Sequence, residues 1–197
     1  MTTRIQKRNR RKILEAALDV FSAQGFRGAT LDQIATVAGL SKPNLLYYFD
    51  SKEGIHRALL EDLLGVWLAP LRALNPEGDP RAEILGYMRR KLQMSREFPR
   101  ESRLFANEVL QGAEHLQGPM GSDLKALVDD KCAIIRRWIA AGRLAPVDPY
   151  HLIFSIWALT QHYADFDAQI RLIRGGRDPM EGAEGFLDTL FDRLLKP

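Results

Sequence analysis

Apolar residues recur at helical spacing along almost all of the 197-residue chain, and no segment alternates apolar and polar residues as a strand does. Between residues 11 and 24, the apolar positions Leu14, Ala17, Leu18 and Phe21 share one helical face, and Gly25 ends the pattern. Glycine and proline mark the breaks between later segments. The periodicity therefore predicts an all-α protein of about nine helices.

The breaks divide the chain into a small helical domain and a larger one. Two short helices should follow Gly25, and longer ones are expected near 51–74, 81–97, 100–112, 120–142, 149–170 and 180–195. We expect a flexible basic arm at residues 1–12, a compact three-helix domain at 13–50 and a second helical domain at 51–197. The long helix that starts at Ser51 should join the two domains.

Charge is distributed unevenly between these domains. Residues 1–60 carry ten lysines and arginines against five acidic residues, whereas the remainder carries 18 basic and 20 acidic residues. This excess of positive charge is compatible with binding to a polyanion and also with a solvated basic tail that has no partner. Charge alone does not distinguish these two interpretations. The stretch Arg4–Lys12 holds six basic residues and no acidic residue. It could be an arm that reaches a DNA groove or a tail that only increases solubility.

Several classes of protein are excluded by composition. No run reaches the ~18 apolar residues of a membrane span, and the basic start lacks the apolar core of a signal peptide. The single cysteine, Cys132, allows neither an intrachain disulfide nor a cysteine zinc site. A lone thiol fits a reducing cytoplasm, and no contact with a membrane is expected.

Residues 30–49 carry the most specific motif in the chain. Thr30 can cap one short helix, Gly39 can adopt the positive φ of a sharp turn, and Ser41 can cap a second helix. Leu45 and Phe49, four residues apart, should anchor this second helix inward. The pattern is that of a helix-turn-helix whose outer face holds Lys42, Asn44, Tyr47 and Tyr48.

That outer face suits a reader of the DNA major groove. Lys42 can donate to guanine, Asn44 can pair with adenine, and Tyr47 can meet a thymine methyl group or a phosphate. Thr30 and Lys52, at helix N-termini, can bind phosphate. A helical hairpin that merely packs is the alternative, which the Gly-Leu-Ser turn and the basic excess disfavour.

Residues 13–60 resemble the DNA-binding domain of the TetR family. The resemblance rests on the segment from Phe21 to Phe26, on the helix-turn-helix and on Lys52, which stands at the family's phosphate-binding lysine position. It implies base contacts from Lys42, Asn44 and Tyr47, and backbone contacts from Thr30, Tyr48 and Lys52. Leu46 replaces the tyrosine of many members, so one phosphate contact should be missing.

The resemblance further implies a repressor that binds a palindromic double-stranded operator as a homodimer and responds to a small molecule. The last two helices are the candidates for the dimer interface, because His151–Phe166 is apolar nearly all round and Phe186–Leu194 is apolar at helical spacing. The alternative is that these residues only fill the core of one subunit.

The candidate effector site centres on Trp157 and Gln161, which share a helical face. A glutamine carboxamide matches the edge of a planar heterocycle, and a tryptophan ring can cover its face. Further contacts are expected from Trp67, Leu68, Arg103 and Glu108. Taken without the resemblance, a glutamine such as Gln161 is more often a core or interface residue than a ligand contact.

Segments 44–49, 67–71, 102–105 and 151–166 resemble the pyrimidine-responsive regulators of the TetR family. This likeness implies a uracil- or thymine-like effector, bound chiefly by Trp157, Gln161 and Tyr163. A TetR-type regulator that senses a drug, a lipid or an amino-acid-like ligand is the alternative within the family.

Two other classes of protein compete with a DNA-binding regulator. A metal-dependent enzyme could use His162 and Asp165 as metal ligands, with His115 as a further candidate. However, no third ligand stands at a spacing typical of a metal site, and no nucleophile or phosphate-loop motif is present. We therefore expect no catalytic residue, no metal site and no cofactor. A helical interaction protein without a role on DNA is the second competitor, and it predicts DNA binding that is indifferent to Lys42 and Asn44.

Overall fold

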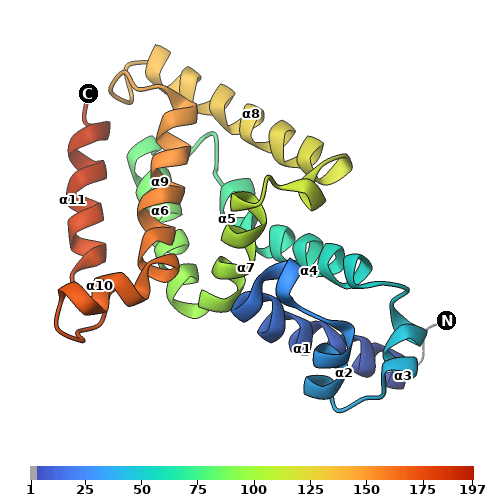
Figure 1. Cartoon of the computed structure of the whole chain (residues 1–197). Coiled ribbons are helices and arrows are strands. Elements are labelled where there is room, and N and C mark those ends of the chain that lie inside the picture. Colours follow the sequence, from blue (N-terminus) through green and yellow to red (C-terminus); the bar gives the residue numbers. More distant parts are fainter. Residues whose placement is uncertain (1–3) are drawn as a thin grey trace. The chain divides into compact units, whose positions relative to one another are not determined.

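The computed structural model describes residues 4–197, which form helices α1 to α11 and one short 3-10 helix, η1, without any strand (Figure 1). The all-α class is thus confirmed for this part of the chain. The bounds are α1 Arg4–Gly28, α2 Leu31–Ala38, α3 Lys42–Tyr48, α4 Lys52–Trp67, α5 Ala69–Arg72, α6 Pro80–Glu97, α7 Pro99–Leu110, η1 Glu114–Leu116, α8 Pro119–Ala140, α9 Pro149–Asp165, α10 Asp167–Ile173 and α11 Ala183–Leu195. Across residues 4–197, none of these helices is both long and apolar enough to span a membrane.

Helices α1 to α11 divide between two compact units. The N-terminal unit comprises the chain up to Gly65 together with Arg103–Gly118, and the C-terminal unit comprises Val66–Ser102 together with Pro119–Pro197. A segment from the middle of the sequence therefore belongs to the same unit as α1, α2 and α3. The proposed functional boundary at residues 50 and 51 stays a prediction.

Local signals fix the helix-turn-helix in the N-terminal unit. The Thr30 hydroxyl accepts a hydrogen bond from the Gln33 amide, and the Gln33 side chain accepts one from the Thr30 amide, which closes a capping box on α2. Gly39 ends α2 in the left-handed conformation, with φ of 63°. Ser41 caps α3 through the Asn44 amide. Each of these three predicted roles is confirmed.

Helix α1 departs from the prediction at its beginning. Arg4–Lys12, expected as a flexible arm, forms the first part of α1, and the same helical trace continues to a kink at Gly25 with φ of 71° and ψ of 170°. The predicted break at Gly25 is therefore confirmed, whereas the flexible arm is corrected for residues 4–12. The remaining arm residues, 1–3, lie outside the described part of the chain.

Two predicted helices are each split in the structure. The expected helix 51–74 is interrupted at Leu68, after which α5 begins with Pro70 in its first turn. Proline has no amide hydrogen to donate to the Val66 carbonyl, so the hydrogen-bond ladder cannot continue through it. The expected helix 149–170 ends at Asp165, and α10 starts directly after Phe166.

The C-terminal unit is built around α6, which packs against α9 and α11, while α8 packs against α9. Figure 1 shows α6 and α9 side by side. Their facing residues form an apolar core with α8 and α11 that includes Ile84, Met88, Leu92, Ile135, Trp138, Leu152, Ile156, Leu187 and Phe191. Trp157 of the expected effector site packs against this core, and Gln161 lies half-buried one turn further along α9.

Candidate functional sites

The outer face of α3 is exposed as predicted. Leu45 and Phe49 are buried, whereas Lys42, Asn44 and Tyr47 lie on the surface, with Tyr47 70% exposed. Because α3 has only seven residues, its position depends on these two apolar anchors and on the Ser41 cap. The result is a short helix that presents a cation, a carboxamide and a phenol to solvent, which are groups suited to base edges in the major groove.

The ammonium of Lys42 lies 2.8 Å from a carboxylate oxygen of Asp32 on α2. Both side chains are largely exposed, so the ion pair contributes little free energy and is easily exchanged for another partner. Lys42 can therefore leave Asp32 for a guanine at low cost.

Both tyrosines of α3 are held by the beginning of α1. The Gln6 side-chain amide donates to the Tyr47 hydroxyl at 3.2 Å, and the Asn9 amide donates to the Tyr48 hydroxyl at 2.9 Å. The Arg10 guanidinium lies 4.3 Å from the centroid of the Phe49 ring. These contacts explain why the basic segment is helical, since it packs on the helix-turn-helix.

Lys52 and Thr30, which are predicted to bind phosphate, both have hydrogen-bond partners within the protein. The Lys52 ammonium donates to the carbonyl oxygens of Phe26 and Ala29 at 2.9 Å each, and it lies 4.5 Å from the Phe26 ring centroid. It therefore holds the end of α1 and the start of α2 together, where the carbonyls of α1 favour a cation. Thr30 is exposed and closes the capping box of α2.

In the C-terminal unit, Trp157 contacts a residue that was not predicted. Its indole nitrogen donates to the Tyr87 hydroxyl at 2.6 Å, and burial raises the pKa of Tyr87, which keeps the phenol neutral. Gln161 and Asp165 follow Trp157 at intervals of four, so the three share one face of α9. Trp157 contacts α6 through Tyr87, and Gln161, which is half-buried, follows it by one turn on the same side of α9.

Lys91 is the main residue that sequence reasoning missed. It is 1% exposed, and its ammonium lies 4.4 Å from the centroid of the Trp67 ring. Burial lowers the pKa of Lys91 to about 7, against the raising effect of Asp165. Among the described residues, the buried indole nitrogen of Trp67 has no hydrogen-bond partner. The signal was present, because Lys91 interrupts the apolar stripe of α6 that runs from Ile84 through Met88.

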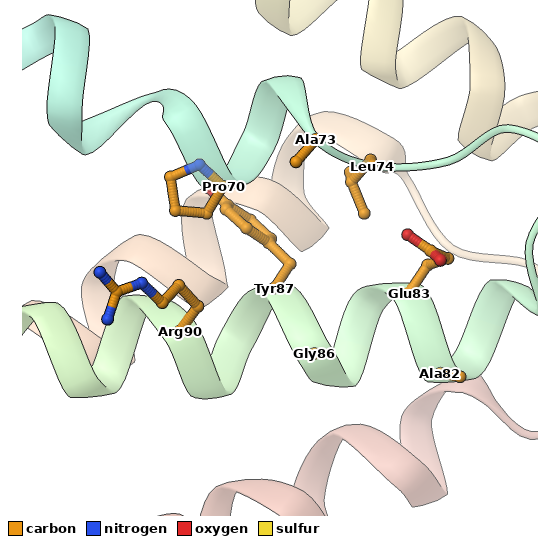
Figure 2. Close-up of a pocket in the computed structure, with 8 residues that line it drawn as sticks. All are labelled: Pro70, Ala73, Leu74, Ala82, Glu83, Gly86, Tyr87 and Arg90. Atoms are coloured by element: carbon orange, nitrogen blue, oxygen red, sulfur yellow. The ribbon is translucent and has the colours of Figure 1, made fainter.

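A cavity of about 270 Å³ lies between α5 and α6 (Figure 2). Figure 2 shows the Tyr87 ring pointing from α6 toward Pro70, with Glu83 and Arg90 on either side along the helix. No predicted effector residue lines it, but Tyr87 connects it to Trp157 by their hydrogen bond.

Other predicted effector residues do not share this face. Leu68 is buried at the break between α4 and α5, and Tyr163 is two residues from Gln161, which places it on another side of α9. Arg103 is exposed and belongs to the N-terminal unit. Their roles as effector contacts stay predictions.

Glu108 also belongs to the N-terminal unit, where two histidines hold it. One carboxylate oxygen lies 3.0 Å from His56 Nε2 and 3.1 Å from His115 Nδ1, and the other accepts the His115 amide at 2.7 Å. Burial lowers the pKa of His56. Burial also opposes the charged form of Glu108, but hydrogen bonds from His56 and His115 leave the pKa of Glu108 lowered. Sequence reasoning missed His56, because 52 residues separate it from Glu108.

Comparisons with known proteins match both the N-terminal and the C-terminal part of the sequence. The family described as bacterial regulatory proteins, tetR family, matches residues 13–59, and the family described as YcdC-like protein, C-terminal region, matches residues 60–196. The HTH-type transcriptional regulator RutR of Escherichia coli strain K12 is 53% identical over 166 residues, which cover 84% of this chain and 78% of RutR. The HTH-type transcriptional repressor NicS of Pseudomonas putida is 28% identical over 137 residues, or 69% of this chain and 64% of NicS.

Solved structures share the fold at low sequence identity. A TetR-like transcriptional regulator from Rhodococcus sp. RHA1 has a TM-score of 0.68 at 22% identity and covers 94% of each chain. The regulator AibR, solved with isovaleryl coenzyme A and operator DNA, has a TM-score of 0.63 at 19% identity, covering 79% of this chain and 85% of AibR.

Proposed function

The chain belongs to the TetR family and is a DNA-binding transcriptional regulator, and from this we propose that it is a homodimeric repressor controlled by a uracil- or thymine-like effector. The observation that carries the proposal for DNA is the exposed row Lys42, Asn44 and Tyr47 on a capped helix-turn-helix. Thr30, Tyr48 and Lys52 would contact the phosphate backbone around it. A regulator of this kind would act in the cytoplasm, on the bacterial chromosome.

Two copies of α3 are needed for a palindromic operator, because one short helix reads only one half-site. Apolar side chains support α9 and α11 as the dimer interface. Phe186, Leu190 and Leu194 lie at intervals of four on α11 and are all exposed, whereas Leu187 and Phe191 of the same helix are buried in the core. On α9, Phe154 is exposed as well. A second copy would bury this exposed stripe.

Hydrogen-bond donors around α6 and α9 support a planar effector with carbonyl groups. The indole nitrogen of Trp67 and the ammonium of Lys91 are both donors, and Gln161 adds a carboxamide with donor and acceptor groups. A uracil-like ring has two carbonyl acceptors and two N–H donors in one plane, and it can stack on an indole. The choice of a pyrimidine rests on the likeness of residues 151–166 to the pyrimidine-responsive regulators of the family and on these hydrogen-bond donors.

Effector binding would change operator affinity through α4. This helix begins at Lys52, four residues after α3 ends, and its last residue is Trp67. An effector that contacts Trp67 would bias the orientation of α4 and so the separation of the two recognition helices. Successive major grooves lie about 34 Å apart, so only one separation fits the operator. The effector acts only if its affinity differs between the two states.

Selection of bound fragments from random DNA, with and without saturating uracil, tests the proposal. We expect the selected fragments to share a palindromic site. Asn44→Ala should reduce the free-energy preference for this site over other sequences by about 1–3 kcal/mol, and uracil should change the affinity of the wild type for it. Gln161→Leu should keep operator binding but lose the uracil response, whereas Gln169→Leu on exposed α10 should keep both. Operator affinity that is unchanged by uracil would exclude the pyrimidine, and a response to another aromatic compound would then identify the effector class.

A further inference from the structure

Three side chains of types that bind metal ions meet in the N-terminal unit, outside the surface proposed to contact DNA. His56 comes from α4, Glu108 from α7 and His115 from η1, and one donor atom from each lies within 4.8 Å of the others. We propose that these three residues form a binding site for a divalent first-row transition metal, with zinc as the probe. This site goes beyond the proposed regulatory function and does not depend on it.

The donor set has the chemistry of a known class of metal site. Two imidazoles and one carboxylate bind zinc with a water as the fourth ligand, and the same set binds ferrous iron with open positions. Donors around a tetrahedral zinc, at bonds of ~2.0–2.1 Å, are about 3.3 Å apart. Glu108 Oε2 already lies 3.0 and 3.1 Å from the two imidazole nitrogens.

Burial makes this cluster different from an exposed group of polar residues. The side chains of His56 and Glu108 are 2% and 4% exposed, and the rings of Phe21 and Phe26 lie within 5 Å of the His56 ring by centroid. Without a cation, both imidazoles must offer a proton to the one carboxylate of Glu108, whose second oxygen lies 3.3 Å from His115 Nδ1 and also accepts the His115 backbone amide. A bound cation would satisfy all three donor atoms at once.

The tautomer of His56 is not fixed by a second partner. Within residues 4–197, its buried Nδ1 atom has no hydrogen-bond partner, so the proton can move there and leave Nε2 free to bind a metal. Metal-binding histidines usually have a partner on the second nitrogen, and its loss typically costs 10–100-fold in affinity. We therefore expect binding that is about 10–100-fold weaker than in a fully supported zinc site.

A cavity of about 210 Å³ gives access to the cluster. Glu108 and His115 line it, together with the carboxylates of Glu53 and Glu114 and the guanidinium of Arg27. It has room for a water as the fourth ligand, and two additional carboxylates against one cation favour the entry of a metal ion. His115, the half-buried member, faces this entry.

A metal at this site would link η1 and the end of α7 to α4, which follows α3 in the chain. Metal binding would therefore stabilise the N-terminal unit, because an ion that binds only the folded state shifts the unfolding equilibrium.

The test uses the full-length protein after removal of metal with EDTA. Zinc titration by calorimetry should give one equivalent per chain, and zinc should raise the Tm. His115→Gln should weaken binding at least 10-fold. The matched control is His162→Gln, which removes an exposed histidine of the C-terminal unit and should bind zinc as the wild type does.

Cobalt(II) provides a readout that needs no variant. In the wild type it should give the intense visible absorption of a four-coordinate ion, which zinc then displaces. Binding well below one equivalent, a cobalt spectrum like that of the hydrated ion, or a folded His115→Gln protein that binds zinc as tightly as the wild type would overturn the proposal.

Discussion

At the scale of single residues, the buried Lys91 contributes to the pH dependence of stability. Burial lowers the pKa of its ammonium from 10.5 to about 7 in the folded chain, whereas the unfolded chain keeps the ordinary value. Between pH 7 and 10.5 the unfolded state therefore binds more protons, so this residue makes stability rise with pH across that window. Below pH 7 both states carry the proton and the slope disappears.

Replacement of Lys91 by methionine should abolish this contribution. From pH 8 to pH 9, the free energy of unfolding of the wild type should rise by about 1 kcal/mol more than that of Lys91→Met, because one pKa unit corresponds to about 1.4 kcal/mol. Urea denaturation at both pH values and one protein concentration measures this. Arg90→Met, which removes an exposed neighbouring cation, should keep the wild-type slope. Equal slopes in wild type and Lys91→Met would show that the ammonium is not desolvated.

At the scale of elements, the turn between α2 and α3 depends on one backbone conformation. Gly39 has φ of 63°, and a Cβ atom there would meet nothing within 4 Å, so the cost of Gly39→Ala is conformational rather than steric. We expect Gly39→Ala to destabilise the protein by ~1–2 kcal/mol. Gly54→Ala, inside α4 with only an ordinary contact at 3.6 Å, should instead stabilise it by about 0.5–1 kcal/mol. Thermal denaturation distinguishes the two, and a shared sign would contradict this account of the turn.

The elements also show why sequence predicts some features and not others. The caps at Thr30 and Ser41 and the turn at Gly39 were predictable, because each depends on residues within a few positions. The helical form of Arg4–Lys12 was not, since its basic composition resembles a tail and its contacts with Tyr47 and Tyr48 cross about 40 residues. For the same reason no local spacing could reveal that His56 meets Glu108.

At the scale of the whole molecule, dimerisation should control operator binding. Phe186 is 60% exposed in the stripe on α11, so Phe186→Glu would place two charges in the proposed interface of a dimer. We expect the dimer dissociation constant to rise by ~30-fold or more, with a parallel loss of operator affinity. Sedimentation at several protein concentrations measures it. Leu172→Glu, at an 83% exposed position on α10, should leave the dimer intact, and a Phe186→Glu protein that dimerises as tightly as the wild type would place the interface elsewhere.

The contacts of Gln6 and Asn9 with the two tyrosine hydroxyls bear on how target preference can diverge among related regulators. If these tyrosines contact DNA as proposed, a hydroxyl that an upstream amide already orients would meet a base or a phosphate in a preset direction. Substitutions of Gln6 or Asn9 would then shift which DNA sequences are favoured while every side chain of α3 stays the same.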